Sequence, residues 1–283
     1  MATSLVYGEC CVLPRLISRE TSGGESCSPG SGRLSAVAAL VRRHDHDRFQ
    51  TALFAPAERR EALFALYAFN YEVARVRETV SEPVLGQIRL QWWRESIAAA
   101  FEGGPVRRHV VVEPLAAAIR AHDLTRAHFD RLIDAREDDL GEAPLASLAA
   151  LENYAEGTSA RLVYLALESL GVRDATAEEA AFHIGIAYAL AGRLRAMPYQ
   201  PRVSCAPAPA EIAAAASRHL GLARARRSAV PRSALPALLP AIIVERSLVR
   251  LKRAGYDPFD PAVTAPDAMQ SWRLAIASLS NRY

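Results

Sequence analysis

Lysine is almost missing from this sequence: Lys252 is the only lysine among its 34 basic residues. A bias of this extent reflects the base composition of the genome more than a separate choice of guanidinium at each position. Single arginines are therefore no evidence for phosphate binding. The near-absence of lysine therefore argues against the interpretation that each arginine contacts a ligand.

The cysteines form no pattern, and no apolar run is long. Cys10, Cys11 and Cys27 lie in an irregular N-terminal stretch and Cys205 stands alone, which excludes a disulfide framework and a zinc-site spacing and fits a reducing compartment. The longest apolar stretch, 234–244, reaches about half of the roughly 20 residues that span a bilayer. No transmembrane helix is expected.

Short catalytic motifs are also missing. The sequence has no glycine-rich phosphate loop and no nucleic-acid-binding motif. Ser159 and His183 have neither a nucleophile-elbow context nor a third triad member. We therefore predict no catalytic residue of these kinds and no nucleic-acid partner.

The residues that are abundant favour helix nearly everywhere. Alanine, leucine and arginine dominate from residue 35 onward, and apolar residues recur there at the helical period. We predict an all-α protein with a single helical-bundle domain at 35–283, preceded by a disordered tail at 1–34 that has no such period. The expected helices are 59–79, 84–101, 112–121, 125–139, 146–170, 177–196, 209–227, 233–254 and 267–280.

Charge is unevenly distributed along the chain. Residues 130–180 carry twelve acidic and four basic side chains, whereas residues 218–253 carry one acidic and nine basic ones. A basic segment with few aromatic residues is suited to anionic lipid headgroups or to an acidic protein face. A solvated helix face is the simpler interpretation of this segment, and both alternatives stay open.

The segment Ala65–Phe69, followed by a helix, resembles the opening of the first substrate helix in squalene and phytoene synthases, which have the all-α isoprenoid-synthase fold. In those enzymes the helix continues into a DxxxD pattern. Carboxylates four residues apart share one helix face and hold Mg²⁺ ions that neutralise a diphosphate. Here Ala74 and Glu78 occupy the two positions, and Arg75 stands where the enzymes often have a further aspartate.

The second motif of that family reads roughly G-x-A-x-Q-x-x-N-x-x-R-D-x-x-x-D. Gly185, Ala187 and Arg195 match it, but Ala196 and Gln200 replace both aspartates. The second metal cluster would therefore have no anionic oxygen ligand. We predict no metal site and no cofactor; Mg²⁺ is implied only if the protein is an active enzyme.

A narrower resemblance is to the squalene/phytoene-synthase-like branch that includes a mitochondrial respiratory complex I assembly factor. The segments that carry it fall in the same order along the chain: 68–82, 88–93, 152–156, 195–199 and 270–273. This resemblance implies a non-catalytic assembly or binding factor with a protein client, such as a respiratory-complex subunit. It also implies that the protein is located in the cytoplasm, at the surface of the inner membrane, which it would contact through segment 218–253. If the source is eukaryotic, the implied location is the matrix side of the mitochondrial inner membrane.

Ten positions are equivalent to the family's site, and we expect them to line a cavity between two facing helices. They share one face of each helix by their spacing, and they are Tyr67, Asn70, Tyr71, Ala74, Glu78, Gly185, Ala189, Gly192, Arg195 and Ala196. With these residues the site should be apolar, partly filled by the tyrosines, with at most one acid.

Two other functions remain open. One is a working prenyl-diphosphate-condensing transferase, which would need a replacement metal site built from Glu78 with Glu72 or Glu137. The other is a lipid or quinone carrier that keeps the cavity without the chemistry. Trp92 and Trp93 fit either a prenyl tunnel or the core, and the run His44-Asp45-His46-Asp47 is interpreted as a polar helix start.

Overall fold

The structure, a computed structural model, describes residues 34–141, 147–199 and 207–283. Within these ranges the chain is helical and has no β-strand, which confirms the all-α prediction. The predicted tail, Gln200 and Cys205 lie outside the described residues, apart from Leu34.

The α-helices, in chain order, are α1 Ala36–His44, α2 His46–Ala52, α3 Ala57–Ala74, α4 Val76–Thr79, α5 Pro83–Glu102, α6 Val112–His122, α7 Arg126–Glu137, α8 Leu148–Ala155, α9 Arg161–Ser169, α10 Ala175–Ala196, α11 Pro209–Ala225, α12 Leu235–Leu238, α13 Pro240–Arg253, α14 Pro261–Thr264 and α15 Gln270–Leu279. A π-helical turn at Glu156–Ala160 joins α8 to α9, and short 3₁₀ turns lie at 138–140, 197–199, 227–229 and 232–234.

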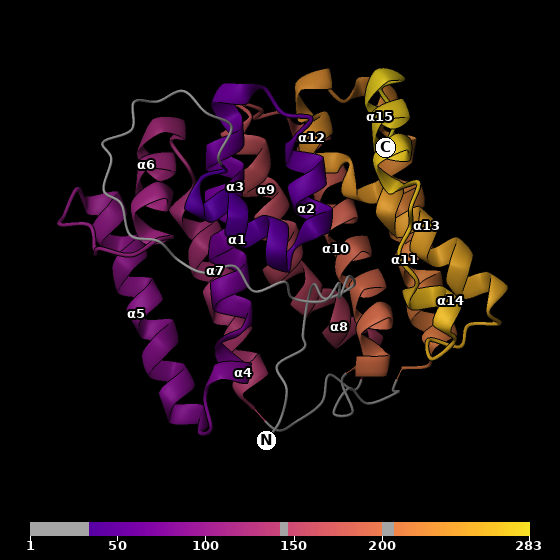
Figure 1. Ribbon diagram of the computed structural model, residues 1–283, viewed down its shortest axis with the longest axis horizontal. Coiled ribbons are helices and arrows are strands. Elements are labelled where there is room, and N and C mark those ends of the chain that lie inside the picture. Colours follow the sequence, from indigo (N-terminus) through magenta and orange to yellow (C-terminus); the bar gives the residue numbers. More distant parts are fainter. Residues whose placement is uncertain (1–33, 142–146, 200–206) are drawn as a thin grey trace, which may run out of the picture.

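Helix α10 runs through the middle of the bundle, between α3 to α7 on one side and α11, α13, α14 and α15 on the other (Figure 1). It packs against α8, α9, α11, α13 and the π-helical turn. Its small residues permit this crowding: a Cβ atom at Gly185 would lie 2.4 Å from Cα of Ala160. Gly185 therefore allows close contact between the two helical segments at this point.

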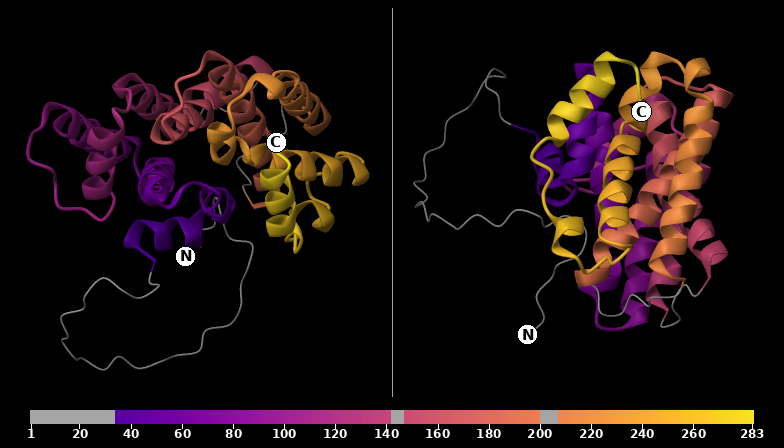
Figure 2. Two further views of the ribbon diagram at one scale, coloured as in Figure 1. Left: turned by 90° about the horizontal axis from the view of Figure 1, so that it is seen from above. Right: turned by 90° about the vertical axis from the view of Figure 1, so that its right-hand side faces the viewer.

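The long helices form an arc, and α1, α2, α14 and α15 lie together on its inner side (Figure 2). Gln270 at the start of α15 connects that helix to α2. Its amide nitrogen donates to Asp47 Oδ1 at 2.9 Å and to Gln50 Oε1 at 2.8 Å. Segments more than 200 residues apart in the sequence thus face the same space.

Three of the predicted helices are interrupted in the structure. The first long helix ends at Ala74, and Arg75 separates it from α4. The predicted helix at 233–254 is divided before Pro240, because proline has no amide hydrogen to continue a helix. The predicted helix at 146–170 contains the π-helical turn, and such turns are frequent at functional sites.

Candidate functional site

A cavity of about 580 Å³ opens between the inner faces of the helices. Its wall comes from the α1–α2 junction, α3, α8, the π-helical turn, α10, α13 and the α14–α15 region. Helices α3 and α10 contribute facing walls, as the sequence led us to expect. The cavity is in the size range of small-molecule sites in proteins.

Seven of the ten positions expected at the site line this cavity; they are Asn70, Tyr71, Ala74, Ala189, Gly192, Arg195 and Ala196. Tyr67, Glu78 and Gly185 do not. Gly185 packs against the backbone of Ala160 instead of facing the cavity. Tyr67 is buried behind Arg48, and the Arg48 guanidinium lies 5.8 Å from the centroid of the Tyr67 ring. Glu78 belongs to α4, because the break at Arg75 moves it off the face of α3.

The expectation of an apolar site with at most one acid is wrong. Asp45, Asp47 and Asp267 all line the cavity, together with seven arginines. Two of the acids come from the run His44–Asp47. Asp45 does begin a helix, because its side chain accepts a hydrogen bond from the amide of Arg48. The same turn also directs the acids to the cavity, which the local sequence pattern does not reveal.

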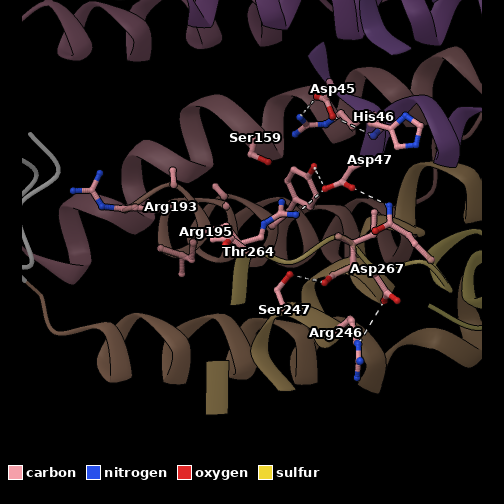
Figure 3. Close-up of a pocket in the computed structure, with 18 of the residues that line it drawn as sticks. Asp45, His46, Asp47, Ser159, Arg193, Arg195, Arg246, Ser247, Thr264 and Asp267 are labelled. Atoms are coloured by element: carbon pink, nitrogen blue, oxygen red, sulfur yellow. Dashed lines mark hydrogen bonds and ion pairs between the residues drawn. The ribbon is translucent and has the colours of Figure 1, made fainter. Parts of the chain in front are cut away.

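Asp47 and Arg195 form a partly buried ion pair across the cavity (Figure 3). The Arg195 guanidinium donates to Asp47 at 2.9 Å, and the Gln270 amide and the Tyr188 hydroxyl also donate to this carboxylate. Burial alone would raise the pKa of Asp47, but Arg195 and Gln270 outweigh it and hold the pKa below its usual value. Asp47 is therefore ionised and fully hydrogen-bonded in the folded protein.

Asp45 and Arg48 form a second pair of the same kind, 2.7 Å apart. Arg48 also lies over the ring of Tyr188, 4.5 Å from its centroid. Burial opposes the charge on Arg48, yet Asp45 and the tyrosines raise its pKa above the ordinary value. This side of the cavity is therefore electrically balanced, with one arginine to each aspartate.

The opposite side is not balanced. Asp267 is the one carboxylate near three arginines: Arg246 Nε at 3.5 Å, Arg250 at 3.8 Å and Arg273 Nε at 3.4 Å. These separations are longer than charge-assisted hydrogen bonds, which lie near 2.8 Å. We call Arg246, Arg250, Asp267 and Arg273 the C-terminal arginine cluster. Sequence reasoning missed it, although Arg246 and Arg250 share a face of α13 by their spacing of four.

Several buried polar atoms at the cavity have no hydrogen-bond partner among the described residues, and Ser159 Oγ, Arg195 Nε and Arg246 Nε are among them. Ser159 lies in the π-helical turn and points toward the open space of the cavity (Figure 3). Buried polar atoms of folded proteins are normally paired. A ligand or water in the cavity would satisfy these atoms.

No cluster of three or more histidine, cysteine, aspartate or glutamate residues in the described ranges is suited to hold a metal ion. Of the carboxylates weighed for a replacement site, Glu72 pairs with Arg75 and Glu137 pairs with Arg94, at 3.3 and 2.8 Å. Neither lines the cavity, and nor does Glu78. The residues present do not fit a magnesium cluster of the type that the family's motifs build.

Trp92 and Trp93 belong to the core rather than to a tunnel. Trp93 is buried and meets the ring of Phe69 edge to face, 5.3 Å away. Trp92 packs against Trp93 and against His109. Neither indole lines the cavity.

Folding brings part of the basic segment against the acidic one. Arg218 pairs with Glu152 and Arg226 with Glu179, so the basic segment 218–253 lies against the acidic segment 130–180. Arg224 pairs with Glu245 inside the basic segment itself. Among the described helices, none is long and apolar enough to cross a membrane.

Comparison with known proteins gives a consistent result. The family model of squalene/phytoene synthase matches residues 41–204. The chain is 34% identical to "NADH dehydrogenase (ubiquinone) complex I, assembly factor 6" of Rattus norvegicus over 96% of this chain and 90% of that one. The protein of the same name from Homo sapiens is 32% identical over 95% and 94% of the two chains.

A solved structure shares the fold. The squalene synthase of Alicyclobacillus acidocaldarius superposes with a TM-score of 0.69 at 20% identity, and covers 79% of this chain and 94% of its own. At this identity the likeness concerns the fold alone. The C-terminal arginine cluster lies beyond residue 204, outside the part that the family model matches.

Proposed function

The chain belongs to the squalene/phytoene synthase family, and we propose that within it the chain acts as a non-catalytic assembly factor for respiratory complex I. The observation that carries this proposal is the similarity, over nearly the whole length of both chains, to relatives that bear the name of complex I assembly factor 6. The proposed partner is a protein, such as a subunit of the complex under construction.

The positions of the family's metal ligands support a role without prenyl-diphosphate chemistry. Ala74 and Ala196 line the cavity at two positions where the enzymes carry aspartates, and neither side chain can bind a cation. The cavity wall carries seven arginines and three aspartates, so it is basic, whereas an empty two-metal site is strongly acidic. Such a wall repels Mg²⁺ rather than collecting it.

The proposed location follows from the proposed client. Complex I assembles at the inner membrane, so the protein would work in the cytoplasm at that membrane, or on the matrix side in a mitochondrion. Contact with the membrane surface would use the basic residues of segment 218–253 that make no ion pair with described residues, which are Arg227, Arg232, Lys252 and Arg253.

The test is deletion of the gene in the organism that carries it. We expect loss of assembled complex I on native gels and loss of NADH:ubiquinone activity, while the other respiratory complexes stay at their normal level. The wild-type chain and Glu78→Gln, which removes the one carboxylate left in the family's first motif, should both restore the complex. Normal complex I in the deletion strain would refute the proposal, and failure of Glu78→Gln alone would favour the transferase.

A further inference from the structure

Helix α15 carries a row of exposed apolar side chains. They are Met269, just before the helix, and Trp272, Ile276 and Leu279 within it, with exposed fractions of 51%, 66%, 62% and 82%. Their spacings of three, four and three residues place them on one side of the helix. We call these four residues the α15 apolar stripe. Single exposed apolar residues are common, whereas a contiguous row of them marks a contact surface.

The opposite side of α15 is held by the protein. Leu274 and Ala277 are buried, and Gln270 and Ser271 form hydrogen bonds with residues of α2. The α15 apolar stripe lines neither the central cavity nor the smaller groove between α11 and α13. Figure 2 shows no other element of the described chain over this side of the helix. The stripe is therefore a ridge that projects from the surface, and not part of a ligand pocket.

The charged side chains along α15 are all of one sign. Residues 268–283 contain two arginines, Arg273 and Arg282, and no acidic side chain. The side chain of Arg273 is 43% exposed, and Arg282 is exposed as well. At the end of the helix, Arg224 Nε donates to the backbone carbonyl of Tyr283 at 2.9 Å, which brings the basic end of α11 to the same place. A surface that meets the stripe is therefore favoured if it is anionic.

The size of the stripe favours a lipid surface over a protein. Each partner in a stable protein interface buries about 800 Å² with about 20 to 30 residues, and four side chains on one ridge provide only a small part of that. A second copy of the chain would also bring arginines against arginines. A lipid surface needs no matching groove, because its apolar layer closes around each projecting side chain. Helices with tryptophan on the apolar side and arginine beside it are typical of membrane interfaces.

From this we propose that α15 is a membrane-binding helix, and that its apolar stripe inserts into the interface of an anionic lipid surface. Trp272, Ile276 and Leu279 enter the boundary between headgroups and acyl chains, while Arg273 and Arg282 face the anionic headgroups. The basic residues of segment 218–253 then attract the surface without inserting into it. The inference does not rest on the assembly function, because it concerns binding of the purified chain to lipid.

The experiment measures flotation of the full chain with two kinds of vesicle, phosphatidylcholine alone and phosphatidylcholine mixed with phosphatidylglycerol. We expect binding at least about tenfold tighter to the anionic vesicles, and weaker binding at high salt. Brominated acyl chains should quench tryptophan fluorescence, and Trp272→Phe should remove most of this quenching, because Trp92 and Trp93 pack in the core. Equal binding to both vesicles would refute the anionic surface. No binding to either would overturn the inference and assign the stripe to a protein partner.

Variants locate the contact on α15. Ile276→Gln and Leu279→Gln should each weaken binding to anionic vesicles roughly five- to tenfold, because each removes one inserted aliphatic side chain. Ile88→Gln in α5 is the matched control and should leave binding unchanged, since Ile88 is as exposed as Ile276, at 61% against 62%. An equal loss in Ile88→Gln and Ile276→Gln would overturn the inference. So would binding that is abolished by neutralising the basic residues of segment 218–253 but unaffected by Ile276→Gln.

Discussion

The two sides of the cavity use the same residue types in opposite ways. On the side of α2 and α10, each aspartate holds one arginine at 2.7 or 2.9 Å, and the charges cancel. On the side of α13 and α15, one aspartate faces three arginines at 3.4 to 3.8 Å, and they do not. Closed pairs of the first kind hold the helices in place, whereas the open cluster of the second kind keeps an excess of positive charge.

The largest effect is expected when an arginine is replaced by leucine on each side of the cavity in turn. Arg195→Leu leaves Asp47 ionised and buried without its cation, so we expect a loss of about 3 kcal/mol in the free energy of unfolding. Arg273→Leu should change it by less than about 0.5 kcal/mol, because Asp267 keeps two arginines and Arg273 is 43% exposed. Urea unfolding followed by circular dichroism measures both; equal losses would contradict the division into closed and open sides.

A second test separates the packing role of α10 from its role as cavity wall. Gly185→Ala would place a Cβ 2.4 Å from the backbone of Ala160, so we expect a loss of about 2 kcal/mol. Gly192→Ala meets no atom within 4 Å and should stabilise the helix by up to about 1 kcal/mol. Thermal unfolding of the two variants gives the answer, and a stabilised Gly185→Ala would show that the helices are not in close contact.

A third test uses a pair of histidines on the far side of α10. Nδ1 of His183 lies 2.9 Å from Nδ1 of His219, so the pair holds at most one proton between these atoms. Burial lowers the pKa of both, and for His183 the charge of His219 adds to the effect. The unfolded chain thus binds more protons below about pH 6.5, and stability should fall by on the order of 1 kcal/mol between pH 7 and pH 5.

His183→Gln is the matched variant for this pH dependence. It removes one of the two groups that must stay neutral, so its free energy of unfolding should fall less steeply than that of the wild type over the same interval. Parallel curves for the two proteins would show that the decline arises elsewhere.

The smallest effect is expected at Glu78. Partial burial of its carboxyl group, together with the charge of Asp139, raises its pKa to about 7, although Arg75 and Arg136 oppose the shift. A raised pKa means that ionisation costs stability as the pH rises from about 4.5 through 7, so Glu78→Gln should stabilise the protein at pH 8 and not at pH 4. Because solvent still reaches much of this side chain, the expected change in the free energy of unfolding is only a few tenths of a kcal/mol. A loss of stability of Glu78→Gln at pH 8 would mean that the ionised carboxylate makes a stabilising interaction, and it would contradict this prediction.

The sequence predicted the fold well because helix period and breakers are local. It predicted the cavity only in part. The sequence around a glycine such as Gly185 does not show whether the residue faces a cavity or packs against another backbone segment. Here it packs against the backbone because Ala160, from a distant part of the sequence, lies beside it. Asp45 illustrates the same limit, since one side chain caps α2 and lines the cavity, and local pattern reveals only the first task.

The C-terminal arginine cluster could not be predicted from the sequence. Its members come from α13, the loop before α15 and α15 itself, and the excess charge appears only when the three arginines meet a single acid. With basic residues that are almost all arginine, composition gave no reason to single them out. The family's motifs gave no reason either, because the match ends at residue 204.

The central proposal is that this member of the family acts without magnesium-dependent prenyl condensation. It is tested most directly by incubating the purified chain with radiolabelled farnesyl or geranylgeranyl diphosphate and millimolar Mg²⁺, and by separating the products. We expect neither diphosphate release nor a C30 or C40 product above a protein-free control, because Ala74 and Ala196 line the cavity at two positions where the enzymes of the family carry aspartates. A condensed product that appears with Mg²⁺ and disappears with EDTA would contradict the account.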